Sequence, residues 1–144
     1  MTSQQEMQNV KECENVILDV AWLTDHGPHL QIVDHFTPDG SFSRDGEVHV
    51  GKAALEEMYK KRPQSLFTRH ILSNLRVKIL SDTQAVAISY ATVFRFRNSS
   101  GSPPIQPVDL SKPESISEYY DTFQKVSGTW KISARLLKTM INIV

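Results

Sequence analysis

The stretch TRHILSNLRVKILSDTQAVAISYATVF, residues 68–94, decides the fold class. It contains two runs rich in β-branched and aromatic residues, separated by the turn residues Ser81-Asp82, which is the pattern of a β-hairpin. Two further runs of the same kind follow, joined at Ser127-Gly128. The second half of the chain therefore predicts an antiparallel meander of four strands, at residues 70–80, 85–97, 115–126 and 130–141.

The first half of the chain has helical periodicity instead. Val10, Cys13 and Ile17 recur at the spacing of one helical face, which predicts a first helix over residues 3–26. Similar reasoning predicts helices over about 28–36 and 51–62, with a turn at residues 37–40 and a short strand at 41–44 between them. Helices followed by an antiparallel meander are typical of an α+β protein.

Length and composition favour one globular domain over residues 1–144. Lys plus Arg and Asp plus Glu both number 16, which argues against nucleic-acid and anionic-membrane partners. The single cysteine, Cys13, fits a reducing compartment, and the N-terminus lacks the pattern of a signal peptide. No apolar run is long enough to span a membrane. We therefore expect a cytoplasmic protein with no membrane association.

The strand over 85–97 carries information about volume. One of its faces presents Ala85, Ala87, Ser89 and Ala91, whereas the other presents larger side chains. The small face accommodates either a closely packed helix or a ligand cavity. The large apolar face also needs covering, and because the helices cannot cover both sides of one sheet, a homodimer through the sheet face is expected.

Asp25 and His70 are the candidate catalytic residues. Asp25 ends the first helix beside Trp22, where the helix dipole and desolvation would raise its pKa, although a solvated aspartate at a frayed helix end is the alternative. His70 begins a strand, where histidine serves either as a structural hydrogen-bonding residue or as a base. If the sheet curls around the first helix, a carboxylate bonded to one ring nitrogen would make the other nitrogen more basic. Asn74 would then anchor the loop or orient a carbonyl.

No metal site is predicted. His26, His29, Asp34 and His35 cluster in sequence, but Gly27-Pro28 breaks the helix between the first two histidines. Arg95 and Arg97 fit exposed positions at a strand end, with contact to a phosphate or an acid as the alternative.

Several separated stretches resemble one family. LTDHGPHLQIVDHFTPDGSF (23–42) is similar to its helix-end aspartate, second helix and turn, and GKAALEEMYKKRP (51–63) to its third helix. TRHILSNLRVKILSDTQAVAISYATVF is similar to its R-H-x-x-x-N strand and central hairpin, and YYDTFQKVSGTWKISARLL (119–137) to its closing hairpin. Together they resemble the SnoaL-like branch of the fold shared by nuclear transport factor two, ketosteroid isomerase and scytalone dehydratase.

The resemblance implies a cone-shaped, curved antiparallel sheet wrapped around three N-terminal helices, with an apolar pocket inside and dimerisation through the sheet. It also implies that Asp25 and His70 form an acid–base pair in that pocket, with no metal or organic cofactor. The side chains expected around a small hydrophobic ligand are Trp22, Phe42, Arg44, Leu55, Tyr59, Asn74, Ser89, Ala91 and Tyr119.

The sequence also departs from the dehydratase-like members. Thr24 and Arg44 stand where those enzymes have tyrosines, Ala91 where they have a second histidine, and Tyr119 where they have an asparagine. Scytalone itself is therefore not expected to be the substrate. The oxyanion-hole arrangement of ketosteroid isomerase has no clear counterpart either, although Tyr119 offers a hydroxyl.

Two functions remain open at this point. One is a small lyase or isomerase acting on a hydrophobic, carbonyl-bearing ring compound through Asp25 and His70. The other is a non-catalytic dimeric protein that binds a small molecule or serves as an accessory subunit, because one fold hosts many functions. The enzyme requires Asp25 to reach His70 and the free ring nitrogen to face an open cavity.

Overall fold

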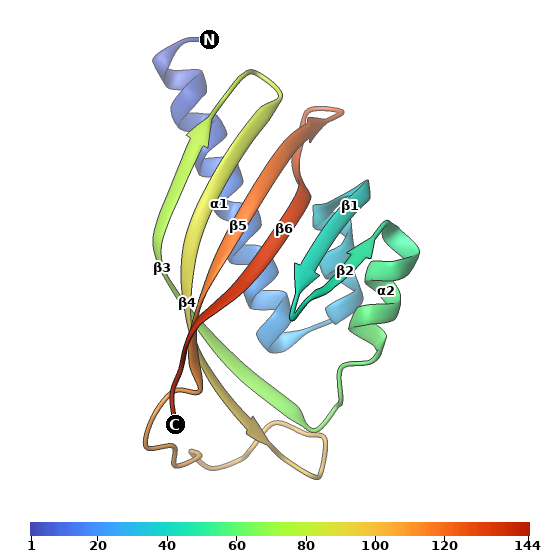
Figure 1. Ribbon diagram of the computed structural model, residues 1–144, viewed down its shortest axis with the longest axis vertical. Helices are drawn as coiled ribbons and strands as arrows, with labels where there is room; N and C mark the ends of the chain where they lie inside the picture. Colours follow the sequence, from blue (N-terminus) through green and yellow to red (C-terminus); the bar gives the residue numbers. More distant parts are fainter.

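The computed structural model describes all 144 residues and has the predicted α+β class (Figure 1). Its three helices are α1 (Ser3–His26), a 3-10 helix η1 (His29–His35) and α2 (Lys52–Lys60). Its strands are β1 (Phe36–Arg44), β2 (Glu47–Val50), β3 (Leu66–Ile79), β4 (Gln84–Arg97), β5 (Ser115–Val126) and β6 (Thr129–Asn142). Helix and strand types agree with the sequence over most of the chain.

The six strands form one mixed sheet in the order β2-β1-β6-β5-β4-β3. The predicted meander of β3 to β6 is antiparallel, but β1 runs parallel to β6, so the expectation of a wholly antiparallel sheet is corrected. Because β1 enters from the helical segment at one end of β6, it lies along β6 in the same direction. β2, which the sequence did not predict, pairs with β1 as a short edge strand.

Residues 37–40 lie within β1 rather than in a free turn. The pairing of β1 with β6 shifts register between Phe36 and Ser41, so the turn-forming residues are accommodated in a bulge. A Cβ atom at Gly40 would lie 3.0 Å from the carbonyl oxygen of Ile132. Glycine at this position therefore allows the bulge to approach β6 closely.

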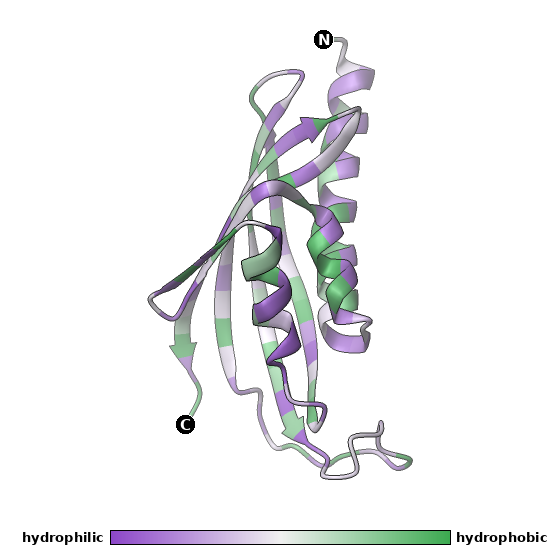
Figure 2. Ribbon diagram, turned by 90° about the vertical axis from the view of Figure 1, so that its right-hand side faces the viewer, coloured by the Kyte–Doolittle hydropathy of each residue, from purple (hydrophilic) through white to green (hydrophobic).

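Helix α1 packs across one face of the curved sheet, and α2 lies on that same side (Figures 1 and 2). Thr2 caps the N-terminus of α1 in a capping box with Gln5, and Gly27, at φ 70°, ends that helix. Its buried apolar stripe comprises Cys13, Val16, Ile17 and Val20, which join the main hydrophobic core. This packing directs the C-terminal end of α1 toward the start of β3.

The small residues of β4 are buried, and the cavity begins beyond them along the strand. Ala85 and Ala87 are buried in the same core as the apolar stripe of α1, so close packing explains that part of the strand. Further along the same face, Val93 and Arg95 line a cavity. Ser89 and Ala91 are fully buried as well and do not line the cavity, so the small residues fit close packing and not a ligand cavity.

The opposite face of the sheet carries apolar side chains with no helix over them. Ile88, Tyr120 and Leu136 lie side by side across β4, β5 and β6, and Ile88 and Leu136 are 41% and 38% exposed.

None of the helices is long and apolar enough to cross a membrane. The segment 98–114 has no helix or strand.

Replacing Ala87 by leucine tests the close packing beneath α1. Extra methyl groups in a filled core force side chains off their rotamers, so the free energy of unfolding should fall by about 1–3 kcal/mol. Urea denaturation measures this change. Val86→Leu on the opposite face is the control and should have a small effect, whereas equal effects of the two changes would contradict the packing.

Candidate active site

Asp25, in the last turn of α1, joins the helix to β3. One carboxylate oxygen, Oδ1, accepts hydrogen bonds from the Thr68 hydroxyl (2.9 Å) and the His70 ring nitrogen Nδ1 (2.6 Å). The other, Oδ2, accepts from the His70 backbone N–H at 2.8 Å. Three donors from one strand therefore fix the carboxylate in place.

His70 has one ring nitrogen engaged and one available. Because the Asp25 carboxylate is an acceptor, Nδ1 carries the proton of the neutral imidazole, and Nε2 is left with its lone pair. Nε2 makes no hydrogen bond with the protein, and the side chain, only 9% exposed, lines the cavity. The histidine thus lines the cavity with one ring nitrogen free of protein partners.

The environment of Asp25 differs from the sequence expectation. Burial acts to raise its pKa, but the hydrogen bonds from the His70 ring and backbone, the nearby His70 charge and the Thr68 hydroxyl together lower it. The predicted rise in pKa is therefore wrong. Trp22, expected to desolvate Asp25, is 62% exposed and stacks on the His26 ring instead.

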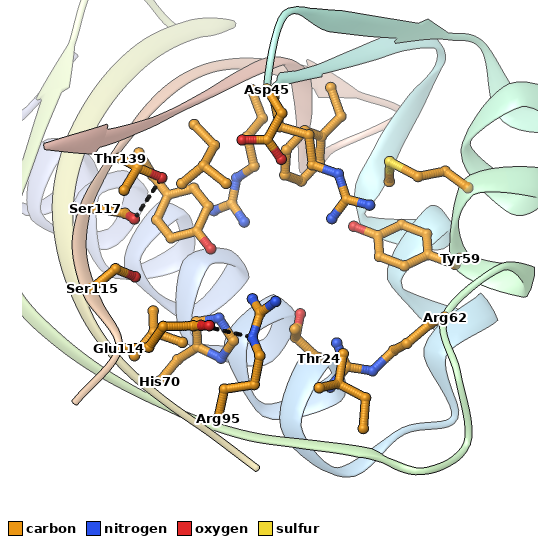
Figure 3. Close-up of a pocket in the computed structure, with 18 of the residues that line it drawn as sticks. Thr24, Asp45, Tyr59, Arg62, His70, Arg95, Glu114, Ser115, Ser117 and Thr139 are labelled. Atoms are coloured by element: carbon orange, nitrogen blue, oxygen red, sulfur yellow. Dashed lines mark hydrogen bonds and ion pairs between the residues drawn. The ribbon is translucent and has the colours of Figure 1, made fainter. Parts of the chain in front are cut away.

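A cavity of about 460 Å³ opens between α2 and the inner face of the sheet (Figure 3). Tyr59 and Arg62 enter it from one side, and His70, Glu114 and Ser115 from the opposite side (Figure 3). Only 7 of its 21 lining residues are hydrophobic. The expected apolar pocket is therefore corrected to a largely polar one.

Four of the residues expected around the ligand line this cavity: Phe42, Arg44, Tyr59 and Tyr119. The others lie elsewhere, for separate reasons. Leu55, Ser89 and Ala91 are fully buried, and Trp22 stacks outside the cavity. Asn74, at φ 52°, occupies a register shift in β3, where asparagine tolerates left-handed backbone geometry better than most residues.

Two tyrosines present neutral hydroxyls at the cavity. Burial raises the pKa of Tyr59 to about 12 and also raises the pKa of Tyr119, despite the nearby Arg135. Neither hydroxyl makes a hydrogen bond with the protein, and both residues line the cavity. Each can therefore donate a hydrogen bond to a ligand oxygen at neutral pH.

The ion pair of Arg135 and Asp121 under the cavity was not predicted from the sequence. Arg135 Nε and Nη2 donate to the two carboxylate oxygens at 2.7 and 2.9 Å, and both residues are buried. The Arg135 guanidinium also lies 4.3 Å from the centre of the Tyr119 ring. Alternation from the buried Trp130 and Ile132 would place Arg135 on the outer face, but the register shift at Thr122 and Phe123 turns it inward, opposite Asp121, so no local pattern signalled the pair.

Arg62, just after the end of α2, is a second residue that was not predicted from the sequence. Its Nη2 donates to the Thr68 hydroxyl at 3.0 Å, and that hydroxyl in turn donates to Asp25. Arg62 is thereby linked to the Asp25–His70 pair through one side chain. No group of three or more His, Cys, Asp or Glu side chains is arranged to hold a metal ion.

Comparison with known proteins places the sequence in a family. The SnoaL-like domain profile matches residues 5–136. The chain belongs to the SnoaL-like family. No curated protein sequence matches it.

Solved structures agree on the fold of this SnoaL-like domain. It is similar to a candidate scytalone dehydratase from Novosphingobium aromaticivorans, with 19% identity, a TM-score of 0.78, and coverage of 99% of this chain and 91% of that chain. A Catenulispora acidiphila protein in complex with S-DNPA gives 19% identity, a TM-score of 0.70, and coverage of 92% and 94%. A type 2 hexachlorocyclohexane dehydrochlorinase gives 13% identity, a TM-score of 0.75, and coverage of 99% of this chain and 92% of that chain. These likenesses establish an NTF2-like, cystatin-like fold.

The lowered pKa of Asp25 predicts how its contribution to stability depends on pH. A carboxyl group with a lowered pKa in the folded protein stabilises it above the ordinary value of 3.8, and this contribution is lost as the pH falls through the lower folded-state value. Asp25→Asn should therefore reduce the free energy of unfolding by about 1–3 kcal/mol at neutral pH, with a smaller difference in acid.

Urea titrations of both proteins between pH 7 and pH 2 measure this difference. Asp82→Asn, in an exposed turn, is the control and should match the wild type at every pH. A difference for Asp25→Asn that stays constant over the whole range would contradict the assignment.

Proposed function

We propose that this SnoaL-like protein is a cofactor-independent lyase or isomerase that removes a proton next to a carbonyl group in a ring compound. In this proposal His70 is the base and Asp25 the residue that orients it. Tyr119 donates a hydrogen bond to the substrate carbonyl. The substrate needs polar groups as well as a ring, because most of the cavity lining is polar.

The single observation that carries the proposal is the 2.6 Å hydrogen bond between Asp25 Oδ1 and His70 Nδ1. It fixes the tautomer with a free Nε2, and the Asp25 charge stabilises the imidazolium that forms when Nε2 takes a proton. An unpaired histidine on a strand would rotate and share both tautomers. The base in this site is oriented before a substrate binds.

The proposed reaction begins when Nε2 takes the proton from the carbon next to the carbonyl. The electron pair of the broken C–H bond forms a carbon–carbon double bond, and the carbonyl oxygen becomes an enolate that accepts a hydrogen bond from Tyr119. Return of the proton to another carbon gives an isomer. Alternatively, expulsion of a β-hydroxyl group, which takes the proton from His70, releases water and completes a dehydration.

Two of the similar structures support this reaction class. Their names describe a dehydratase and a dehydrochlorinase, and both words denote removal of a small molecule across adjacent carbons. Identities of 19% and 13% make this support for the reaction class and not for a substrate.

A general probe of the base is 5-nitrobenzisoxazole, whose ring opens to a coloured phenolate when a base removes its C–H proton. The wild type should accelerate this opening, and His70→Gln should lower the rate by about 100-fold or more, which is typical of a lost general base. Asp25→Asn should also reduce the rate.

His26→Gln is the matched control, since His26 is exposed and bonds only to the backbone carbonyl of Trp22. Its rate should equal that of the wild type. If His70→Gln and His26→Gln were equally active, the base assignment would be wrong. Ligand binding without turnover of any probe would favour the non-catalytic binding protein.

We also propose that two copies pair through the outer face of the sheet. The support is the apolar row of Ile88, Tyr120 and Leu136, which no helix covers. Side chains of this kind gathered in one exposed patch are typical of interfaces between copies.

A charge in the middle of this row should separate the copies. Sedimentation velocity is expected to show a dimer for the wild type and a monomer for Ile88→Glu, because burying an unpaired carboxylate is costly. Ile105→Glu, in the exposed 98–114 segment, is the control and should remain dimeric. A monomeric wild type would refute the pairing.

A further inference from the structure

The cavity carries an excess of positive charge. Its lining includes five cationic side chains, and only two lining carboxylates, Asp45 and Glu114, oppose them. The cationic residues are Arg44, Lys61, Arg62, Arg95 and Arg135.

Ion pairs inside the protein account for only two of these cations. Arg135 is held by Asp121, and Arg95 Nε lies 2.9 Å from Glu114 Oε2. Lys61 and Asp45 are exposed, opposite in sign, and free of ion pairs. Arg44, which is also exposed, and the half-buried Arg62 remain, and neither has a carboxylate within ion-pair distance.

Arg62 is the more enclosed of the two. Its Nη2 donates one hydrogen bond to the Thr68 hydroxyl, and its Nε is buried without a hydrogen-bond partner. Burial and the neighbouring Arg95 lower its pKa, the nearby Asp25 carboxylate opposes them, and Arg44 lowers it further. A half-buried cation with unsatisfied donors is costly unless an acceptor binds it.

Arg44 reaches the cavity from the end of β1. Its guanidinium lies 5.8 Å from the centre of the Phe42 ring and makes no hydrogen bond to the protein. Arg44 and Arg62 thus approach from different elements and offer several free donors. The flat fork of a guanidinium matches the two oxygens of a carboxylate.

We propose that the natural ligand is a carboxylic acid of one or two rings, whose carboxylate is bound by Arg62 and Arg44. This inference rests on the proposed function, since it names the substrate class of the same site. The link from Arg62 through Thr68 to Asp25 puts the anion at the His70 end of the cavity. A cavity of about 460 Å³ has room for the ring beside it.

The test compares 2-naphthoate with its neutral methyl ester, which has the same ring. Isothermal titration calorimetry on the wild-type protein should give a dissociation constant at least about tenfold lower for the acid, because hydrogen bonds to charged groups are stronger than neutral ones. The preference should shrink as salt is added. Equal affinities, or no binding of naphthoate at millimolar concentration, would overturn the proposal.

Variants identify the responsible side chains. Arg62→Gln and Arg44→Gln should each reduce the preference for the acid, while Arg62→Lys, which keeps the charge, should retain part of it. Arg76→Gln removes an exposed cation from the outer face and should leave the preference unchanged. If Arg76→Gln lowered the preference as much as Arg62→Gln did, general attraction of anions would explain the result and the proposed site would be wrong.

A His70→Gln variant separates this inference from the proposed reaction. It should lose the opening of 5-nitrobenzisoxazole and keep the preference for naphthoate over its ester. Loss of the preference in this variant would show that His70, and not the arginines, recognises the acid. A normal preference in a protein that never catalyses proton removal would support the anion site and refute only the reaction.

Discussion

One carboxylate at the end of a helix organises both the fold and the candidate site. Asp25 accepts hydrogen bonds from Thr68 and from the ring and backbone of His70, all of which belong to β3. A desolvated charge needs such donors, so these hydrogen bonds fix how the end of α1 lies against β3. The same bonds fix the tautomer of His70, and the stability of this corner and the orientation of the base therefore have a common origin.

Two further groups of polar contacts lie near that corner. On the sheet side, the Asp121–Arg135 pair takes the place of apolar packing under the cavity, and Arg135 lies against the Tyr119 ring. Such a pair contributes little net stability, but removal of either partner would leave an unpaired buried charge. On the side of α2, Arg62 bonds to Thr68, which in turn bonds to Asp25. This continuity explains why the cavity is polar, although the core that supports it is apolar.

The sequence predicted what depends on local periodicity and turns. Residues 115–126 form the expected strand, and the first helix has its expected bounds, because alternation and capping are local properties. β2 was missed because four residues between a turn and a helix give too little periodicity. The parallel pairing of β1 with β6 is a long-range property that no local pattern carries.

The site was predictable to a different degree. The juxtaposition of Asp25 and His70 came from the family resemblance, since 45 residues separate them and periodicity says nothing about their distance. The contribution of Trp22 was misjudged because its stacking on His26 depends on which way the last helical turn faces. Arg62 and Arg135 were overlooked because an arginine in a sequence is expected to be exposed, and only the tertiary structure turns these two inward.

The most direct test of the Asp25–His70 pair is the tautomeric state of His70 in solution. Long-range proton–nitrogen NMR correlations of the histidine rings near neutral pH, assigned with a His70→Gln variant, report it. We predict a proton on Nδ1, a bare Nε2, and a downfield Nδ1 proton signal that Asp25→Asn abolishes. A proton on Nε2, or spectra of His70 that are identical in the wild type and Asp25→Asn, would contradict the account.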